Sequence, residues 1–417
     1  MNRRGDIVIV GGGPVGAVLG ALLARGPQAA ERRIVLLERD LPTTEIVDAA
    51  TELRVFALSR ASERICRAAE AWAALESTPH ALAAYRRMHV WPASTTPRGA
   101  GSLTFDAAEL GEPDLGHIVG NGHLQRAALA AFRAAGGELR AAKVDDLVFE
   151  ADAVRVRTSA GDLEASLVIG ADGGRSAVRR CAGLGAEQQD YGQLGLVANL
   201  QCERPHEHTA WQRFLGEGTL ALLPLADGRC SLVWSLPTAR AEEWLAATPE
   251  AFSSAVTAAS DGVLGALTLS GERRAFPLRR VHAPAYVRER CALVGDAAHI
   301  VHPLAGQGVN LGLLDAAALV DCIDDAAEVG EAPGAMRVLR RYERWRKGEN
   351  EAMGYAMDLF NRYLAFGDGA VGRFAQQGLG LVARAPMLRR AFVARALGLE
   401  GEMPRAVSRA GRSSPRR

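Results

Sequence analysis

A glycine-rich turn near the N-terminus constrains the fold of this chain more than any other part of its sequence. Residues 6–10 read as a buried strand, and residues 15–24 are apolar on all sides, as in a buried helix. Between them stand Gly11, Gly13 and Gly16, in the spacing GxGxxG. Glycines at these positions permit a tight turn, let the backbone approach a pyrophosphate at the helix N-terminus, and allow close packing. The pattern therefore predicts a strand, turn and helix that bind a dinucleotide.

An acidic residue after the next strand strengthens this interpretation. Residues 33–37 read as a second buried strand that ends at Glu38, where a carboxylate can accept the hydroxyls of a ribose. Residues 1–40 thus predict a βαβ unit in a parallel sheet, with FAD and NAD both open at this point. Residues 7–24 also imitate a membrane span, because 18 residues carry no charge, but the glycines and a proline would interrupt such a helix.

Two later loops have the composition of ligand-binding turns. Residues 169–179 join a strand to a helix through a glycine-rich turn, in which Asp172 alone is better explained as a helix cap than as a ligand contact. Residues 294–312 place Asp296 at a strand end, where its carboxylate could accept a polyol hydroxyl. Glycines in the same loop would turn backbone N–H groups toward an anionic or carbonyl-rich ring. An ordinary connection would not need this density of Gly, Asn and Pro.

The composition excludes several classes of function. The 49 basic and 48 acidic side chains leave a formal net charge of +1, so no overall field selects nucleic acid. Six cysteines lie at least 21 positions apart, which favours a reducing, cytoplasmic setting over a disulfide scaffold. The pairs His206/His208 and His299/His302 lack a third ligand at metalloenzyme spacing, so no metal is expected. A GxSxG nucleophile motif is also missing from the sequence.

The motifs together resemble a known family. The segments GGGPVG, LRVFALS, GADGGRSAVR and GDAAHIVHPLAGQGVNLG occur in the order and approximate spacing of flavoprotein aromatic hydroxylases with the p-hydroxybenzoate hydroxylase fold. Residues 211–237, 275–278 and 341–364 resemble the ubiquinone-biosynthesis hydroxylases in particular. The resemblance covers nearly the whole chain to about Leu399.

The resemblance implies FAD as the cofactor, with NAD(P)H as a transient electron donor. It places the pyrophosphate, ribose, adenine, ribitol and isoalloxazine contacts of FAD on a set of turn and loop residues. These residues are Gly11, Gly13, Pro14, Val15, Gly16, Glu38, Arg39, Arg54, Gln125, Val144, Asp172, Asp296, Pro303, Gly306, Gln307, Gly308, Val309 and Asn310. Residues 121–125 depart from the family pattern, with Gly and His where an Arg and a bulky residue are expected.

The resemblance also implies the reaction. A family member would use O2 and NAD(P)H to hydroxylate a polyprenylated phenol in ubiquinone biosynthesis, through a flavin C4a-hydroperoxide bordered by Pro303, Gly306, Gln307 and Gly308. No side chain is assigned as a nucleophile or base. Three alternatives stay open: a flavin hydroxylase of another aromatic in natural-product or catabolic metabolism, a flavin-dependent reductase of prenyl lipids, and an FAD-binding assembly subunit.

The expected fold is α/β, with a parallel FAD-binding sheet, an inserted antiparallel β substrate domain and a helical C-terminal part. We expect a discontinuous FAD-binding domain, a β-rich substrate domain, a helical region and a disordered tail. The FAD-binding domain comprises residues 1–85, 115–185 and 286–345, and the substrate domain comprises residues 86–114 and 186–285. The helical region is residues 346–403, and the tail is residues 404–417.

The C-terminal sequence bears on location. From Arg384 onward nine arginines face two glutamates, a net +7, among several large apolar residues. Such a segment could lie on an anionic membrane surface, although a C-terminal helix packed on the FAD domain, followed by a disordered Arg-rich tail, explains the helix slightly better. We therefore expect a cytoplasmic protein. Peripheral contact with the inner membrane and association with a ubiquinone-biosynthesis complex both stay open.

Overall fold

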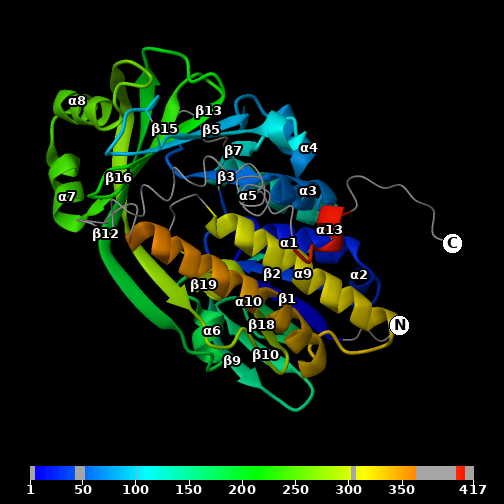
Figure 1. Cartoon of the computed structure of the whole chain (residues 1–417). Coiled ribbons are helices and arrows are strands. Elements are labelled where there is room, and N and C mark those ends of the chain that lie inside the picture. Colours follow the sequence, from blue (N-terminus) through cyan, green and yellow to red (C-terminus); the bar gives the residue numbers. More distant parts are fainter. Residues whose placement is uncertain (1–4, 43–51, 100, 302–306, 363–400, 409–417) are drawn as a thin grey trace.

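The computed structural model describes residues 5–42, 52–99, 101–301, 307–362 and 401–408. Two large β-sheets form the two halves of the molecule, and helices lie between and beside them (Figure 1). The first sheet is mainly parallel and the second mainly antiparallel. This arrangement confirms the predicted α/β fold.

The first sheet is built around β1 (Asp6–Val10), whose five residues are all buried. β1 lies between β2 (Ile34–Glu38) and β11 (Leu163–Gly170) and runs parallel to both. The strands share a run of branched apolar residues because both faces of a parallel sheet are covered. The other strands of this sheet are β8 (Glu138–Ala141), β9 (Val144–Phe149), β10 (Val154–Thr158), β17 (Val287–Arg288) and β18 (Cys291–Leu293).

The helix that follows the glycine turn packs with two other helices beside the first sheet. α1 (Pro14–Arg25) begins directly after that turn and packs against α5 (Asn121–Ala134) and α9 (Gly308–Glu328). Residues 16–24 of α1 are all buried, as the apolar composition of this stretch predicts. Shorter elements are α2 (Gln28–Glu31), α6 (Ala177–Cys181) and the 3-10 turn η2 (Gly295–Ala297).

The second sheet is held together by two long strands. β12 (Glu187–Cys202) and β16 (Leu267–His282) span 16 residues each and pair antiparallel, with register shifts near Asp190 and Ala198. Only β5 and β13 pair in parallel within this sheet as the structure describes it. The remaining strands are β5 (Arg87–Pro92), β6 (Leu103–Asp106), β13 (Thr209–Phe214), β14 (Thr219–Pro224), β15 (Cys230–Pro237) and β19 (His299–Ile300).

Two helices lie within residues 186–285, the part of the chain for which a β-rich domain is expected. α7 (Thr238–Ala246) and α8 (Pro249–Ala259) pack on β12 and β16 at the outer side of the second sheet (Figure 1). Phe252 and Val256 of α8 are fully buried, four positions apart on one helix face. The alternating strands on either side obscured this short helical period in the sequence.

A small three-stranded sheet joins the two halves. It consists of β3 (Val55–Ser59), β7 (Gly116–Gly120) and β4 (Leu82–Tyr85), with β7 in the middle. α3 (Arg60–Ala68) continues directly from β3, and its N-terminal Ser62 N–H is capped by the Ser59 hydroxyl. α4 (Trp72–Ser77) and the 3-10 turn η1 (Ala107–Leu110) complete this region.

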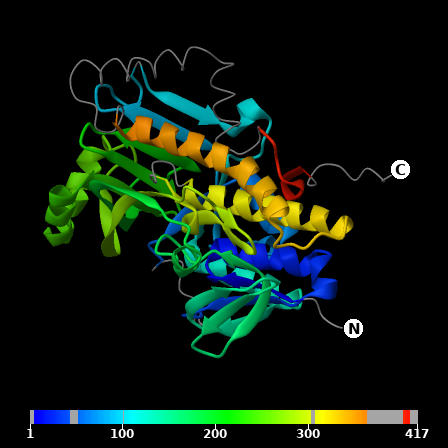
Figure 2. The same ribbon diagram turned by 90° about the horizontal axis from the view of Figure 1, so that it is seen from below.

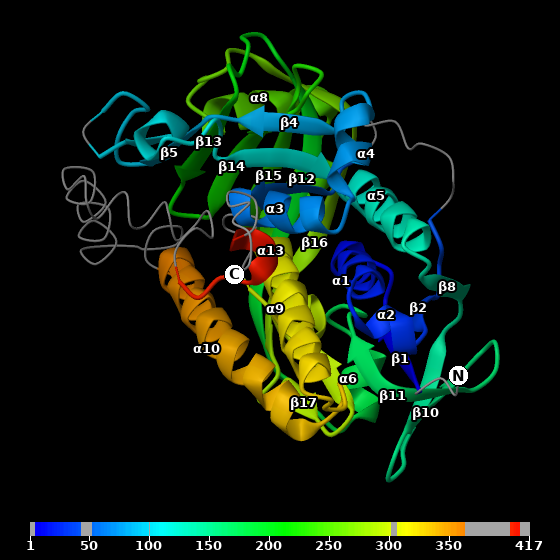
Figure 3. The same ribbon diagram turned by 90° about the vertical axis from the view of Figure 1, so that its right-hand side faces the viewer.

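The C-terminal part begins with a long helix. α10 (Met336–Phe360) runs beside α9 and reaches the second sheet at its C-terminal end (Figure 2). The expectation of a frayed tail from residue 404 is wrong for α13 (Arg405–Ser408), which packs on α3 and α9 (Figure 3). Val407 is 3% exposed, and the Arg405 guanidinium lies 3.0 Å from both Asp321 and Asp325, so a buried apolar side chain and two ion pairs hold this turn. Residues 384–400 and 409–417 lie outside the described residues.

Candidate active site

A cavity of about 1450 Å3 connects the two halves of the molecule. At one end it is bordered by the glycine turn after β1 and by the loop that carries Asp296. At the other end it is bordered by the inner face of the second sheet and by the last turns of α10. A single cavity thus reaches both the predicted cofactor residues and the predicted substrate domain.

The glycine turn is shaped by packing at two positions and open at the third. Gly11 has a φ of +105°, and a Cβ there would stand 2.4 Å from the carbonyl oxygen of Ala171. A Cβ at Gly16 would stand 2.0 Å from the Gly11 carbonyl oxygen. At Gly13, by contrast, a Cβ would meet no atom within 4 Å, and Gly13 borders the cavity. The Gly13 backbone is therefore open to the cavity, with no side chain covering it, at the position where the sequence predicts a pyrophosphate.

Two side chains fix this turn from outside. The Gly12 N–H donates to Glu38 Oε2 at 2.6 Å, and Gln125 Nε2 donates to the Gly12 carbonyl oxygen at 2.8 Å. Both side chains also border the cavity. Glu38 and Gln125 thus lie next to the turn and at the cavity wall, and their contacts to a cofactor stay a prediction.

Asp172 caps a helix and also borders the cavity. Its carboxylate accepts from the backbone N–H groups of Ala177 (2.6 Å) and Val178 (3.1 Å), at the start of α6. The capping role that the sequence favours for Asp172 alone is therefore what the structure shows, and the carboxylate is placed at the cavity wall as well.

Asp296 stands in the half-buried η2 turn at the cavity wall. Burial raises the pKa of its carboxyl, while the nearby Arg54 guanidinium acts in the opposite direction. A donor such as a ligand hydroxyl would be favourable for a carboxylate in this environment.

The other predicted cofactor residues fall into three groups. Most border the cavity: Pro14, Val15, Arg39, Arg54, Val144, Gln307, Gly308 and Val309. Gly16 and Asn310 do not border it, because Gly16 packs on the glycine turn and the Asn310 amide donates to the Ala57 carbonyl oxygen and accepts from the Ser59 N–H. Pro303 and Gly306 lie outside the described residues.

A fully buried ion-pair network supports the Asp296 loop, and the sequence analysis missed it. The Asp315 carboxylate on α9 lies 2.5 Å from His299 Nε2, 2.8 Å from Arg346 Nε and 3.0 Å from Asn350 Nδ2. It also accepts from the Gly295 N–H at 3.2 Å. Burial alone would raise the pKa of Asp315, but His299 and Arg346 outweigh it and hold the pKa well below its usual value. The signal was present, since Asp315 interrupts the apolar face formed by Leu311, Leu314 and Ala318.

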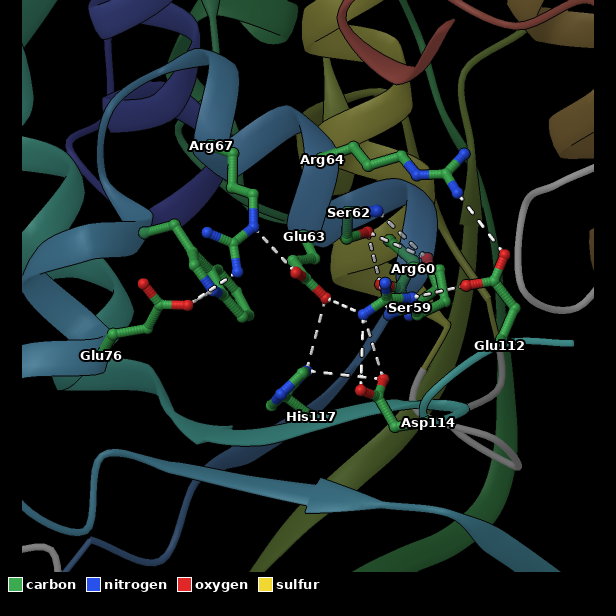
Figure 4. A network of polar contacts seen from close by, with 12 residues as sticks. Ser59, Arg60, Ser62, Glu63, Arg64, Arg67, Glu76, Glu112, Asp114 and His117 are labelled. Carbon is green, nitrogen blue, oxygen red and sulfur yellow. Dashed lines mark hydrogen bonds and ion pairs between the residues drawn. The ribbon is translucent and has the colours of Figure 1, made fainter. Parts of the chain in front are cut away.

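A second polar cluster lies away from the cavity, between α3 and β7 (Figure 4). Glu63, Asp114 and His117 bring their ligand-type atoms within 4.8 Å of one another. The Arg60 guanidinium stands between the two carboxylates, 3.2 Å from Asp114 Oδ1 and hydrogen-bonded to Glu63. Because the guanidinium already neutralises these carboxylates, a cation would have to displace it to bind there. The cluster ties α3 to the small sheet.

The second sheet supplies an apolar wall. Its inward side chains alternate along each strand, so β13 contributes Ala210, Gln212 and Phe214, and β14 contributes Thr219, Ala221 and Leu223. Tyr85 borders the same end, and burial raises the pKa of its phenol, so this hydroxyl stays protonated at physiological pH. A wall of this kind suits an apolar ligand with few polar groups.

Comparisons with known proteins agree with this geometry. The FAD binding domain family matches residues 121–353. The 3-demethoxyubiquinol 3-hydroxylase of Escherichia coli (strain K12) is 36% identical over 95% of this chain and 100% of its own length. Ubiquinone hydroxylase UbiL of Rhodospirillum rubrum is 32% identical over 97% of this chain and 93% of its own. The chain belongs to the ubiquinone-biosynthesis FAD-dependent hydroxylase family.

This hydroxylase is therefore an FAD-dependent monooxygenase, for which NAD(P)H is the usual electron donor. Solved structures agree on the fold. Pseudomonas aeruginosa PqsL in complex with 2-aminobenzoylacetate matches with a TM-score of 0.74 at 24% identity, over 90% of this chain and 99% of that one. The p-nitrophenol 4-monooxygenase PnpA of Pseudomonas putida DLL-E4 matches with a TM-score of 0.74 at 18% identity, over 96% of this chain and 100% of that one. Among the described helices of the hydroxylase, none combines the length and the apolar character that crossing a membrane requires.

Proposed function

We propose that this monooxygenase hydroxylates a polyprenylated phenol in ubiquinone biosynthesis. The observation that carries the proposal is the single cavity, which joins the bare glycine turn to the apolar wall of the second sheet. Its volume of about 1450 Å3 exceeds the roughly 300–1,000 Å3 of a pocket for one small ligand, so a dinucleotide and a lipophilic substrate can share it. The pathway is the one for which the similar hydroxylases of Escherichia coli and Rhodospirillum rubrum are named.

FAD would lie along the glycine turn, with its pyrophosphate at Gly13, its ribose near Glu38 and its ribitol near Asp296. The bare backbone at Gly13 and the half-buried carboxylate at Asp296 both fit this placement. When bound, FAD supplies the electron transfer and oxygen activation that side chains cannot perform. Arg54 and Gln125 would contact the same part of the cofactor.

The residues of the chain orient the substrate and exclude water. The side chains of β13, β14 and β15 would hold the aromatic ring against the apolar wall, and the protonated Tyr85 phenol can donate a hydrogen bond there. Apolar walls reduce the access of water to the reacting groups, which limits side reactions. The described cavity does not single out a general base for the phenol.

We also propose that the substrate reaches the cavity from a membrane or from a lipid-presenting partner. A prenylated phenol resides in the bilayer because each buried CH2 favours the apolar phase by about 0.8 kcal/mol. The basic stretch from Arg384 onward is the part of the sequence suited to an anionic surface.

Lipid analysis of a strain that lacks this protein tests the proposed function. We expect a prenylated phenol one oxygen short of the normal intermediate to accumulate, and re-expression of the chain to remove it. A strain with an unchanged quinone pool would contradict the proposal and would favour a hydroxylase of another aromatic.

A further inference from the structure

An amide side chain stands in the apolar wall of the cavity. Gln212 lies on β13, is only 7% exposed, and points to the cavity side of the second sheet. No residue that the structure describes forms a hydrogen bond with its amide group. The amide therefore faces the cavity without a protein partner, and a ligand bound there can supply its hydrogen bonds.

The strand register shows that protein neighbours do not meet this need. In the ladder Gln212 stands opposite Val90 of β5 on one side and Ala221 of β14 on the other. Along β13 the next inward side chains are Ala210 and Phe214. All four of these neighbouring side chains are apolar, so none of them can form a hydrogen bond with the Gln212 amide.

Two hydroxyl groups lie in the adjacent row of the same wall. Thr219 and Ser235 stand opposite each other on β14 and β15, and they are 3% and 4% exposed. Thr219 Oγ1 has no hydrogen-bond partner among the described residues. The polar groups of the wall are thus gathered in one place, and the inward residues Val233, Val197 and Leu223 around them are apolar.

We infer that Gln212 is a positioning residue that hydrogen-bonds the phenolic hydroxyl of the substrate. An amide suits a neutral phenol because its Oε1 accepts the hydroxyl proton while its Nε2 donates to the same or a neighbouring ring oxygen. This contact fixes which ring carbon is presented to the cofactor end of the cavity. The inference rests on the proposed function and adds the residue that selects the oxygenated end of the substrate.

The test compares two probes on the FAD-loaded, oxidised protein without NAD(P)H, so that no turnover occurs. The probes are 2-geranylphenol and geranylbenzene, which differ only in the hydroxyl, and calorimetry gives Kd for each. We expect the wild type to prefer the phenol about tenfold, and Gln212→Leu to bind both probes alike. Thr209→Val is the matched control, because Thr209 is equally buried on β13 but its hydroxyl donates to the Glu207 carbonyl oxygen outside the cavity.

The outcomes separate this inference from the proposed function. A preference for the phenol that survives in Gln212→Leu, or that is lost equally in Thr209→Val, overturns the role of Gln212 while the proposed function stands. Failure of the wild type to bind either probe overturns the proposed substrate class, and the inference with it. Should Gln212→Leu lose FAD, Gln212→Met keeps the side-chain length and gives the same comparison.

Discussion

Asp315 accepts a hydrogen bond from His299 across 2.5 Å, with the two side chains 0% and 3% exposed. The pair joins α9 to the loop that carries Asp296, and Arg346 of α10 completes it. Three segments far apart in the sequence are thus tied together beneath the cavity by one carboxylate. The most deeply buried ion pair among the described residues, Asp315 with Arg346, thus supports the site without bordering it.

Asp315→Asn should destabilise the protein by up to about 3–5 kcal/mol, because Arg346 would lose its fully buried counter-ion and keep only the partly exposed Glu349. Urea unfolding of the FAD-free protein at pH 7 measures the change. Asp325→Asn is the control, since Asp325 is 43% exposed and its ion pair with Arg341 should contribute at most about 1 kcal/mol. Equal effects of the two variants would contradict the prediction.

The same carboxylate predicts a pH dependence. Because the pKa of Asp315 is lower in the folded than in the unfolded protein, its contribution is present above the unfolded value of about 3.8 and is lost as pH falls below it. The difference in unfolding free energy between wild type and Asp315→Asn should therefore shrink between pH 5 and pH 3. A constant difference across this range would count against the network.

Asp324→Asn should stabilise the protein at neutral pH, in contrast to Asp315→Asn. Burial raises the pKa of Asp324 to about 6, so the folded state loses stability as pH rises from about 4 to 6, and the loss persists above that. A shift of this size corresponds to about 3 kcal/mol, which partial exposure reduces to roughly 1–2 kcal/mol. Melting curves should show a gain for Asp324→Asn at pH 7.5 and none at pH 4, while exposed Glu328→Gln changes little at either pH.

Gly13→Val should abolish FAD binding while leaving the fold intact. A Cβ at Gly13 meets no protein atom within 4 Å, but the side chain would occupy the place proposed for the pyrophosphate. Flavin absorbance per mole of purified protein reports FAD, and the far-UV spectrum reports the fold. Gly16→Ala is the contrast, because its Cβ would collide with the Gly11 carbonyl oxygen and should unfold the turn itself. Full flavin content in Gly13→Val would refute the placement.

Asp296→Ala should also lose flavin without losing stability. Its carboxylate is held at a raised pKa by burial, so removing it costs the apoprotein little. Thermal melts of the FAD-free variants should match within a few degrees, whereas flavin titration should show a much weaker complex. A variant that retained wild-type affinity would show that the ribitol contact lies elsewhere.

Membrane contact should depend on the C-terminal arginines. The full-length protein is expected to float with anionic vesicles at low salt, and serine at Arg384, Arg389, Arg390 and Arg395 should prevent this, since each cation near the lipid contributes about 1 kcal/mol. Four exposed arginines elsewhere serve as the control set: Arg155, Arg157, Arg240 and Arg274. If neither the full chain nor the control set floats, delivery by partner proteins becomes the better account.

The sequence predicted those features whose partners are close along the chain. The βαβ unit and the turn around Asp172 depend on local patterns of burial and glycine, and the structure contains both. The β-rich domain expected over residues 186–285 likewise contains strands of the second sheet. The placement of each cofactor contact stays a prediction, although most of the residues concerned border one cavity.

Features that depend on distant partners could not be predicted in this way. Asp315 and Arg346 are 31 positions apart, and nothing local shows that both are buried. The alternation of β13 shows that Gln212 shares a face with Ala210, but which face meets a cavity depends on the helices and strands opposite. α13 was missed because a single apolar residue, Val407, anchors it within a polar stretch.

β12 and β16 run as one antiparallel ribbon from the second sheet to the first half, where Glu187 pairs with His282. The halves are therefore connected by a hydrogen-bonded ladder rather than by single flexible crossings, and a free hinge rotation would have to break that ladder. Of the two register shifts in this ladder, the one between Asp190 and Gln193 lies nearer the first half of the molecule. That bulge is accordingly the point of least bending resistance, and the natural junction at which a substrate domain from a relative could be grafted.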